Sequence, residues 1–160
     1  MKKLLMLVAA VFALGGDFED GIKAYESSNL AVARDKFVSA CDANDAQACA
    51  RAGALYQLGK DILPDPKKAL ELYEKGCELG AKEACSGAGG MYVSSDKEKA
   101  RSLLNKSCEL GDGFSCATVG SYLLEEKKFK DAYALFQKAC ELKDKLGCEF
   151  AGDLKRSKRL

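Results

Sequence analysis

Eight cysteines are the first residues in this sequence whose type and spacing could carry chemistry. They form four pairs with seven residues between the two members of each pair: Cys41 and Cys49, Cys77 and Cys85, Cys108 and Cys116, and Cys140 and Cys148. Paired cysteines can bind zinc, exchange electrons or form structural disulfides. The spacing of the pairs, and the other residue types in the chain, decide among these three chemistries.

The spacing favours disulfides over a zinc site or a redox-active dithiol. Structural zinc sites use cysteines about two to four residues apart, and the chain has no histidine to complete a mixed site. Redox-active pairs use a tight C-x-x-C motif, which does not occur in this sequence. We therefore expect four structural disulfides, no metal and no other cofactor. In the chain-entropy model each such closure stabilises the fold by about 2–3 kcal/mol.

Ser94 and Lys97 form an S-x-x-K match, which is the second candidate for chemistry. Serine β-lactamases use this motif together with S-D-N and K-T-G elements, and neither element is present here. A serine–histidine triad is excluded because the chain lacks histidine. The neighbouring Ser95 and Glu98 also fit a capping box at the start of a helix. We favour capping, and Ser94 and Lys97 remain the catalytic candidates of the alternative.

A sequence repeat positions the cysteines. The first cysteines of successive pairs lie 36, 31 and 32 residues apart, and three other kinds of position keep the same register. An alanine stands eight residues before each first cysteine, a large apolar residue four before it, and a glycine four after each second cysteine. These are Ala33, Ala69, Ala100 and Ala132; Phe37, Tyr73, Leu104 and Phe136; and Gly53, Gly89, Gly120 and Gly152. Such self-similarity is typical of a repeat array.

The register predicts pairs of helices. Positions eight, four and one before the first cysteine share a helical face, so one helix ends near that cysteine and the next carries the second cysteine and the glycine. A glycine within a helix costs about 1 kcal/mol relative to alanine, so we expect close helix contacts there. Gly21 extends the glycine series. The predicted fold class is all-α, an α/α superhelical solenoid with repeats at about 18–49, 50–85, 86–116 and 117–148 and a terminal half-repeat at 149–160.

The first residues predict export. Lys2 and Lys3 precede an apolar run from Leu4 to Leu14, which is shorter than the roughly 20 residues of a membrane-spanning helix. We assign 1–16 to a signal peptide and 17–160 to the repeat domain, which is secreted or periplasmic and has no membrane span after cleavage. Disulfides persist in those compartments. The 25 Lys and Arg against 24 Asp and Glu give no signal for nucleic acid.

The second unit resembles a known family in four segments: Ala50 to Tyr56, Pro64 to Asp65, Lys68 to Tyr73, and Cys77 to Cys85. These segments resemble Sel1-like repeats, relatives of tetratricopeptide repeats, in the disulfide-rich form called Helicobacter cysteine-rich proteins. The resemblance extends over roughly 18–154. It implies a solenoid and a secreted factor that engages host or envelope proteins. It also brings a penicillin-binding or β-lactamase label, so β-lactam hydrolysis is the alternative function.

The glycine-bearing helix usually lines the concave side of such solenoids. Turning its cysteine and glycine toward the stack leaves a face that we expect to bind a protein or peptide: Gln47, Arg51, Gly87, Gly90, Phe114, Thr118 and Ser121. The glycines would admit a peptide backbone or simply allow packing, and Phe114 is the more suggestive residue. We expect a monomer. A basic tail from Lys155 to Arg159 could dock on an anionic polymer, but a frayed terminus is the plainer interpretation.

Overall fold

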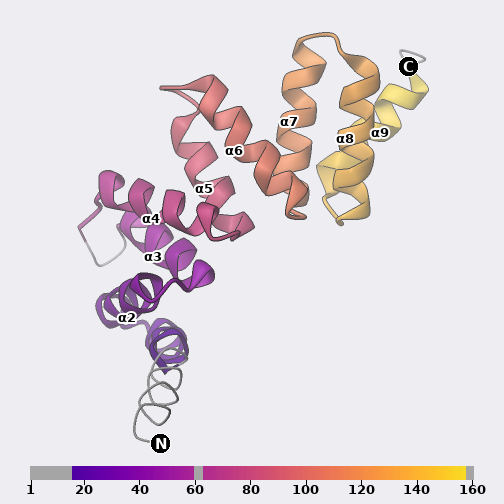
Figure 1. Ribbon diagram of the computed structural model, residues 1–160. Coiled ribbons are helices and arrows are strands. Elements are labelled where there is room, and N and C mark those ends of the chain that lie inside the picture. The colour runs from indigo at the N-terminus through magenta and orange to yellow at the C-terminus, as the bar shows by residue number, and fades with distance from the viewer. Residues whose placement is uncertain (1–15, 60–62, 158–160) are drawn as a thin grey trace, which may run out of the picture. The chain divides into compact units, whose positions relative to one another are not determined.

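The computed structural model describes residues 16–59 and 63–157, which form helices joined by turns and contain no strand. Residues 16–26 are helical. The helices that follow are α2 (Leu30–Asp42), α3 (Ala46–Leu58), α4 (Pro66–Glu78), α5 (Lys82–Tyr92), α6 (Lys97–Glu109), α7 (Gly113–Glu125), α8 (Phe129–Glu141) and α9 (Lys145–Arg156) (Figure 1). The prediction of an all-α array of hairpins is confirmed.

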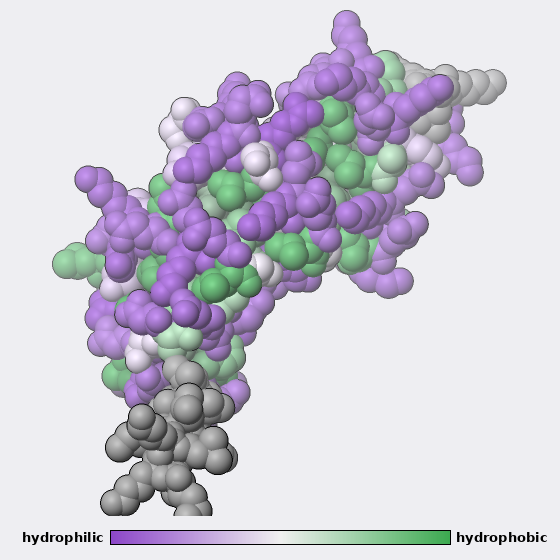
Figure 2. Space-filling model, in the orientation of Figure 1, coloured by the Kyte–Doolittle hydropathy of each residue, from purple (hydrophilic) through white to green (hydrophobic). Residues whose placement is uncertain are grey.

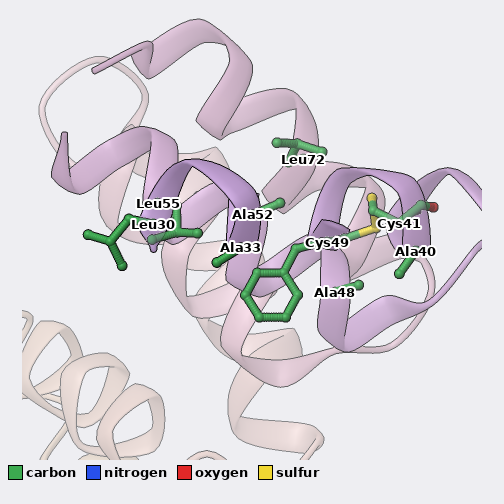
Figure 3. Close-up of a cluster of buried hydrophobic side chains, with 10 residues drawn as sticks. Leu30, Ala33, Ala40, Cys41, Ala48, Cys49, Ala52, Leu55 and Leu72 are labelled. Carbon is green, nitrogen blue, oxygen red and sulfur yellow. Dashed lines mark hydrogen bonds between the residues drawn. A yellow bond between two sulfur atoms is a disulfide. The ribbon is translucent and has the colours of Figure 1, made fainter. Parts of the chain in front are cut away.

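The chain forms two compact units, and the boundary along the sequence lies within α5, between Gly87 and Ala88. In the first unit, α2, α3 and α4 bury a cluster around Phe37 and the Cys41–Cys49 bridge (Figure 3). In the second unit, a cluster around Phe136 includes Cys108 and Cys116 and residues of α7, α8 and α9. Most members of both clusters are alanines and other small residues, so the helices pack closely without a single large core.

Most of the predicted signal peptide, 1–15, lies outside the described residues. Within 16–59 and 63–157, no helix is long and apolar enough to cross a bilayer.

Each hairpin turn reverses at a residue with positive φ, three positions after the first cysteine: Asn44, Gly80, Gly111 and Lys143, with φ of 68°, 94°, 91° and 69°. The N–H of the following residue donates back to a carbonyl five residues earlier, as from Asp45 to Ala40 at 3.0 Å. This is the Schellman arrangement that ends many helices. Glycine adopts the conformation without a steric cost, whereas the two non-glycine turns carry that cost.

Side-chain caps fix where most of the helices begin. Asn29, Asp65 and Asp96 cap α2, α4 and α6, and Asp45, Asp112 and Asp144 cap α3, α7 and α9. The predicted capping box at Ser95 is wrong, because α6 begins one residue later than that box requires. The Asp96 carboxylate accepts from the Lys99 N–H at 2.9 Å, which leaves Ser95 outside the helix.

The expected close contacts occur at four of the five glycines in register. A Cβ built on Gly21, Gly53, Gly89 or Gly120 would lie 2.6, 2.8, 2.9 or 2.8 Å from an atom of Phe37, Tyr73, Leu104 or Phe136, respectively. These large side chains are therefore packed on the bare backbone of the preceding glycine-bearing helix. The expectation is wrong for Gly152, whose Cβ would approach only the flexible end of Arg156, at 3.3 Å.

Candidate functional site

The eight cysteines pair within their own C-x7-C motifs, as the spacing predicts. The four bridges have Cα–Cα distances of 4.6, 4.5, 4.7 and 4.5 Å in chain order. The first cysteine lies in the last turn of one helix and the second in the first turn of the next, so each bridge closes one hairpin. The first three bridges are buried, whereas Cys140 is partly buried and Cys148 is exposed.

The binding-face candidates of the first unit each make a contact within that unit. The Gln47 side-chain amide donates to the Glu83 carboxylate at 3.1 Å and so joins α3 to α5. The Arg51 guanidinium lies 5.7 Å from the ring centroid of Phe18 and also contacts the Phe37 ring. A Cβ on Gly87 would lie 2.6 Å from the Tyr73 ring. Gln47 and Arg51 stay exposed despite these contacts, whereas Gly87 is partly buried, so their part in binding remains a prediction.

The candidates of the second unit differ from one another in what they offer a partner. Gly90 is exposed, and a Cβ there would meet nothing within 4 Å. The Thr118 hydroxyl donates to the Phe114 carbonyl at 2.9 Å, and the Ser121 hydroxyl donates to the Ala117 carbonyl at 3.0 Å, so both are satisfied within α7. Phe114 is 59% exposed. It is therefore the candidate with the most apolar surface left to bury.

Four further apolar side chains extend the surface around Phe114. Leu146 stands two residues before the second cysteine of its hairpin, as Phe114 does, and Phe150 stands two residues after it. Leu110 and Leu142 lie in the turns that lead into α7 and α9. We call the set the apolar strip, and its exposed fractions are 41, 59, 38, 50 and 36% for Leu110, Phe114, Leu142, Leu146 and Phe150.

Contacts within the second unit bring together the helices and turns that carry the apolar strip. Helices α7 and α9 are in contact. The turn before α7 also meets the turn before α9, since a Cβ on Gly113 would lie 3.2 Å from the Cβ of Leu142.

Sequence reasoning found only Phe114, although the cysteine register applied to α9 points to Leu146 and Phe150. On the visible face, Figure 2 shows hydrophobic residues interrupting a mostly hydrophilic surface.

Ser94 and Lys97 lie at an exposed turn and helix start. Lys97 lines a cavity of about 360 Å³ with Val93, Glu98, Arg101, Tyr122, Glu125 and Glu126, and Ser94 is not part of this lining. Hydrogen bonds from Lys128 and Arg101 hold the pKa of Glu126 below its ordinary value. Two cationic side chains and three carboxylates line the cavity, and it does not enclose the candidate nucleophile.

The described residues contain no group of three side chains placed to hold a metal ion.

Comparisons with known proteins agree on the fold. The Sel1 repeat family model matches residues 46–80, 84–112 and 122–144, which together exceed half of the chain. Among solved structures, a protective antigen of uropathogenic Escherichia coli with an SLR fold has a TM-score of 0.70 at 26% identity, over 76% of this chain and 28% of that one. A Sel1 repeat protein from Oxalobacter formigenes has a TM-score of 0.77 at 20% identity, over 85% and 58%.

Curated relatives share only part of their length with this chain. Cytochrome c oxidase assembly factor 7A of Xenopus laevis is 38% identical over 78 residues, which are 48% of this chain and 34% of the relative. The chain thus spans about a third of that protein. The match to the Sel1 repeat family model does not depend on this relative, of which the chain covers only a part. The chain therefore belongs to the Sel1 repeat family, and its four C-x7-C disulfides fit the Helicobacter cysteine-rich type that the sequence resembles.

Proposed function

We propose that the chain is an exported scaffold that binds a protein partner through the apolar strip of its second unit. The observation that carries the proposal is that five large apolar side chains, between 36 and 59% exposed, gather on adjoining turns and helices. Large exposed apolar side chains that cluster on neighbouring elements mark interaction sites in folded proteins. Burying it yields about 25 cal/mol per Å² of apolar area.

The layout of the apolar strip suits an amphipathic helix as the bound segment. Two hairpins each contribute a leucine in the turn and an apolar residue in the following helix: Leu110 with Phe114, and Leu142 with Leu146. An amphipathic helix presents anchors three and four residues apart, which can fill such a double row. Exposed Lys145 flanks the strip and provides part of the polar rim that interfaces have.

Export is the second part of the proposal. Four disulfides in a chain of this size favour a compartment in which disulfides persist, either the periplasm or the outside of the cell. The predicted signal peptide supports the same placement. The similar proteins are described as an assembly factor and as a protective antigen, so we take from them the repeat scaffold and not a particular partner. We expect the partner to be an envelope or host protein and the chain to act as a monomer.

The β-lactamase alternative rests on a family label. An acyl-enzyme requires donors arranged around a developing oxyanion in a water-excluding site. Ser94 lies instead in an exposed turn, so the apolar strip supports binding better than Ser94 supports catalysis.

Capture by matched variants tests the proposal. The oxidised mature protein, its Phe114→Asp/Leu146→Asp double variant and a Leu58→Asp control are immobilised and exposed to envelope and medium fractions. Leu58 is 72% exposed, belongs to the first unit and is not a member of the strip. We expect one stoichiometric protein to bind the wild type and the control and not the double variant, with helix content and melting temperature unchanged. Equal capture by all three would refute the strip as the binding surface.

A further inference from the structure

The fourth disulfide differs from the other three in its exposure to solvent. Cys41, Cys49, Cys85 and Cys116 are 0% exposed, and Cys77 and Cys108 are 2% exposed. Cys140 is partly buried, and Cys148 is exposed. All four bridges close loops of the same length, with a sequence separation of 8. Exposure is therefore the property in which the fourth bridge stands apart.

The packing around α9 explains this exposure. In α9 only Gly147 and Leu154 are buried, whereas α7 buries Gly113, Ser115, Cys116, Ala117, Val119 and Gly120. On the α8 side, Cys140 lines a groove of about 310 Å³ together with Tyr133, Gln137, Glu141, Ala151, Gly152 and Lys155. Cys148 is thus exposed to solvent, and Cys140 borders the groove.

We propose that Cys140–Cys148 is a thiol–disulfide exchange site that forms a mixed disulfide with a partner bearing an accessible thiol. The partner's thiolate attacks the Sγ of Cys148, a new S–S bond forms between them, and the Cys140–Cys148 bond breaks. Its electron pair leaves with Cys140 as a thiolate, so this step causes no net oxidation. If the partner carries a second thiol, that thiolate then attacks the mixed disulfide, which releases Cys148 reduced and the partner oxidised.

Accessibility, and not local charge, selects this bridge. Exchange requires in-line access to a sulfur atom, and exposed disulfides are the labile ones. The placement of the second cysteine in the first turn of a helix is common to all four hairpins, so it does not distinguish them. Lys155 and Glu141 line the groove with opposite charges. Cys148 is the more exposed partner, which makes its sulfur the point of attack.

The hairpin keeps other contacts when the bridge opens. Leu154 is 5% exposed, and the Phe150 ring lies 5.1 Å from the ring of Phe136 on α8. Gly147 also packs against Ala139. These contacts hold α9 on α8 without the covalent link, so exchange at this bridge does not require the second unit to unfold.

Glutathione is the probe that tests the exchange site. The oxidised full chain is incubated with reduced glutathione under native conditions, quenched by alkylation at intervals, and mapped by mass spectrometry. We expect glutathione on Cys148 and an alkylated Cys140, formed about tenfold or more faster than any product at the other pairs. A Cys140→Ser/Cys148→Ser variant should take up no glutathione on that timescale.

The denatured chain supplies the matched control. Because the four loops have equal length, the pairs should react at similar rates in denaturant, and the native preference should disappear. Similar native rates at all four pairs, or a first reaction at Cys77–Cys85, would overturn the proposal. An adduct found on Cys140 instead of Cys148 would overturn the assigned point of attack. Helix content by circular dichroism must stay constant during the first reaction, and its loss would show that reduction follows unfolding.

Discussion

The ring of Tyr73 occupies the space that a side chain at Gly53 would need. A Cβ at Gly53 would lie 2.8 Å from Tyr73 Cδ1, and a Cβ at Gly87 would lie 2.6 Å from Cε1 of the same ring. One aromatic side chain of α4 is thus held between bare backbones of α3 and α5. Its hydroxyl donates to the Gln57 side chain at 2.8 Å, and burial raises the pKa of Tyr73 above its ordinary value.

Gly53→Ala should destabilise the first unit even though alanine favours helix. The added methyl must displace the buried ring, at a cost of about 1–3 kcal/mol. This exceeds the helix-propensity gain of about 1 kcal/mol. Gly90→Ala is the control, because its methyl enters open space, and we expect a gain of up to about 1 kcal/mol. Urea denaturation measures the unfolding free energy of both variants, and equal effects of the two substitutions would contradict the glycine contacts.

Lys143→Gly should stabilise the α8–α9 hairpin. Lys143 has φ of 69°, a conformation that costs an L residue about 1–2 kcal/mol. The greater freedom of glycine in the unfolded chain offsets part of this, so we expect a net gain of about 0.5–1 kcal/mol. Ala134→Gly, at an exposed position inside α8, should instead cost about 1 kcal/mol. A loss at both positions in thermal melts would be inconsistent with the turn geometry.

Asp96→Ala should cost about 1 kcal/mol, because Asp96 caps α6, whereas Ser95→Ala should have little effect. Neither change, nor Ser94→Ala, should alter turnover of a β-lactam. Chemical denaturation measures the change in stability, and mass spectrometry of the protein incubated with penicillin detects any acylation by the β-lactam. A penicilloyl adduct on the wild type that Ser94→Ala abolishes would establish the enzyme alternative.

Asp17 should make the first helix sensitive to acid. Its carboxylate accepts from Lys36 at 2.7 Å and from the Ser39 hydroxyl at 2.6 Å, and these bonds lower the pKa of Asp17 below its ordinary 3.8. Because the folded pKa lies below the unfolded one, the stabilisation is fully present above about pH 3.8 and is lost as the pH falls through the folded value.

The Asp17→Asn variant removes that titration. Between pH 5 and about pH 2, the wild type should lose more unfolding free energy than the variant. Asp35→Asn is the control, because Asp35 is exposed and pairs only with the adjacent Arg34 in the described part of the chain. Parallel pH profiles for the wild type and Asp17→Asn would contradict the assignment.

The fold could be predicted well from the sequence because several kinds of repeated residue indicate the same helices. The cysteines, Ala33 and its equivalents, and Phe37 and its equivalents each report the same helical register. Helix starts were less predictable, since Ser95 and Asp96 are adjacent potential caps and only the geometry of the turn selects Asp96. The binding face remains a prediction. Gln47 and Arg51 are exposed, although each already contacts a neighbouring side chain. Leu146 and Phe150 lie on α9, which buries little of its surface.

Disulfide mapping of the mature chain recovered from its producing cells tests the central claim most directly. The claim is that an exported chain folds as hairpins, each closed by its own bridge. Digestion without reduction, followed by mass spectrometry, should show no free thiol and the pairs Cys41–Cys49, Cys77–Cys85, Cys108–Cys116 and Cys140–Cys148, on a chain that begins near Gly16. A bridge between hairpins such as Cys49–Cys77, or a chain with reduced cysteines and an intact N-terminal segment, would contradict the account.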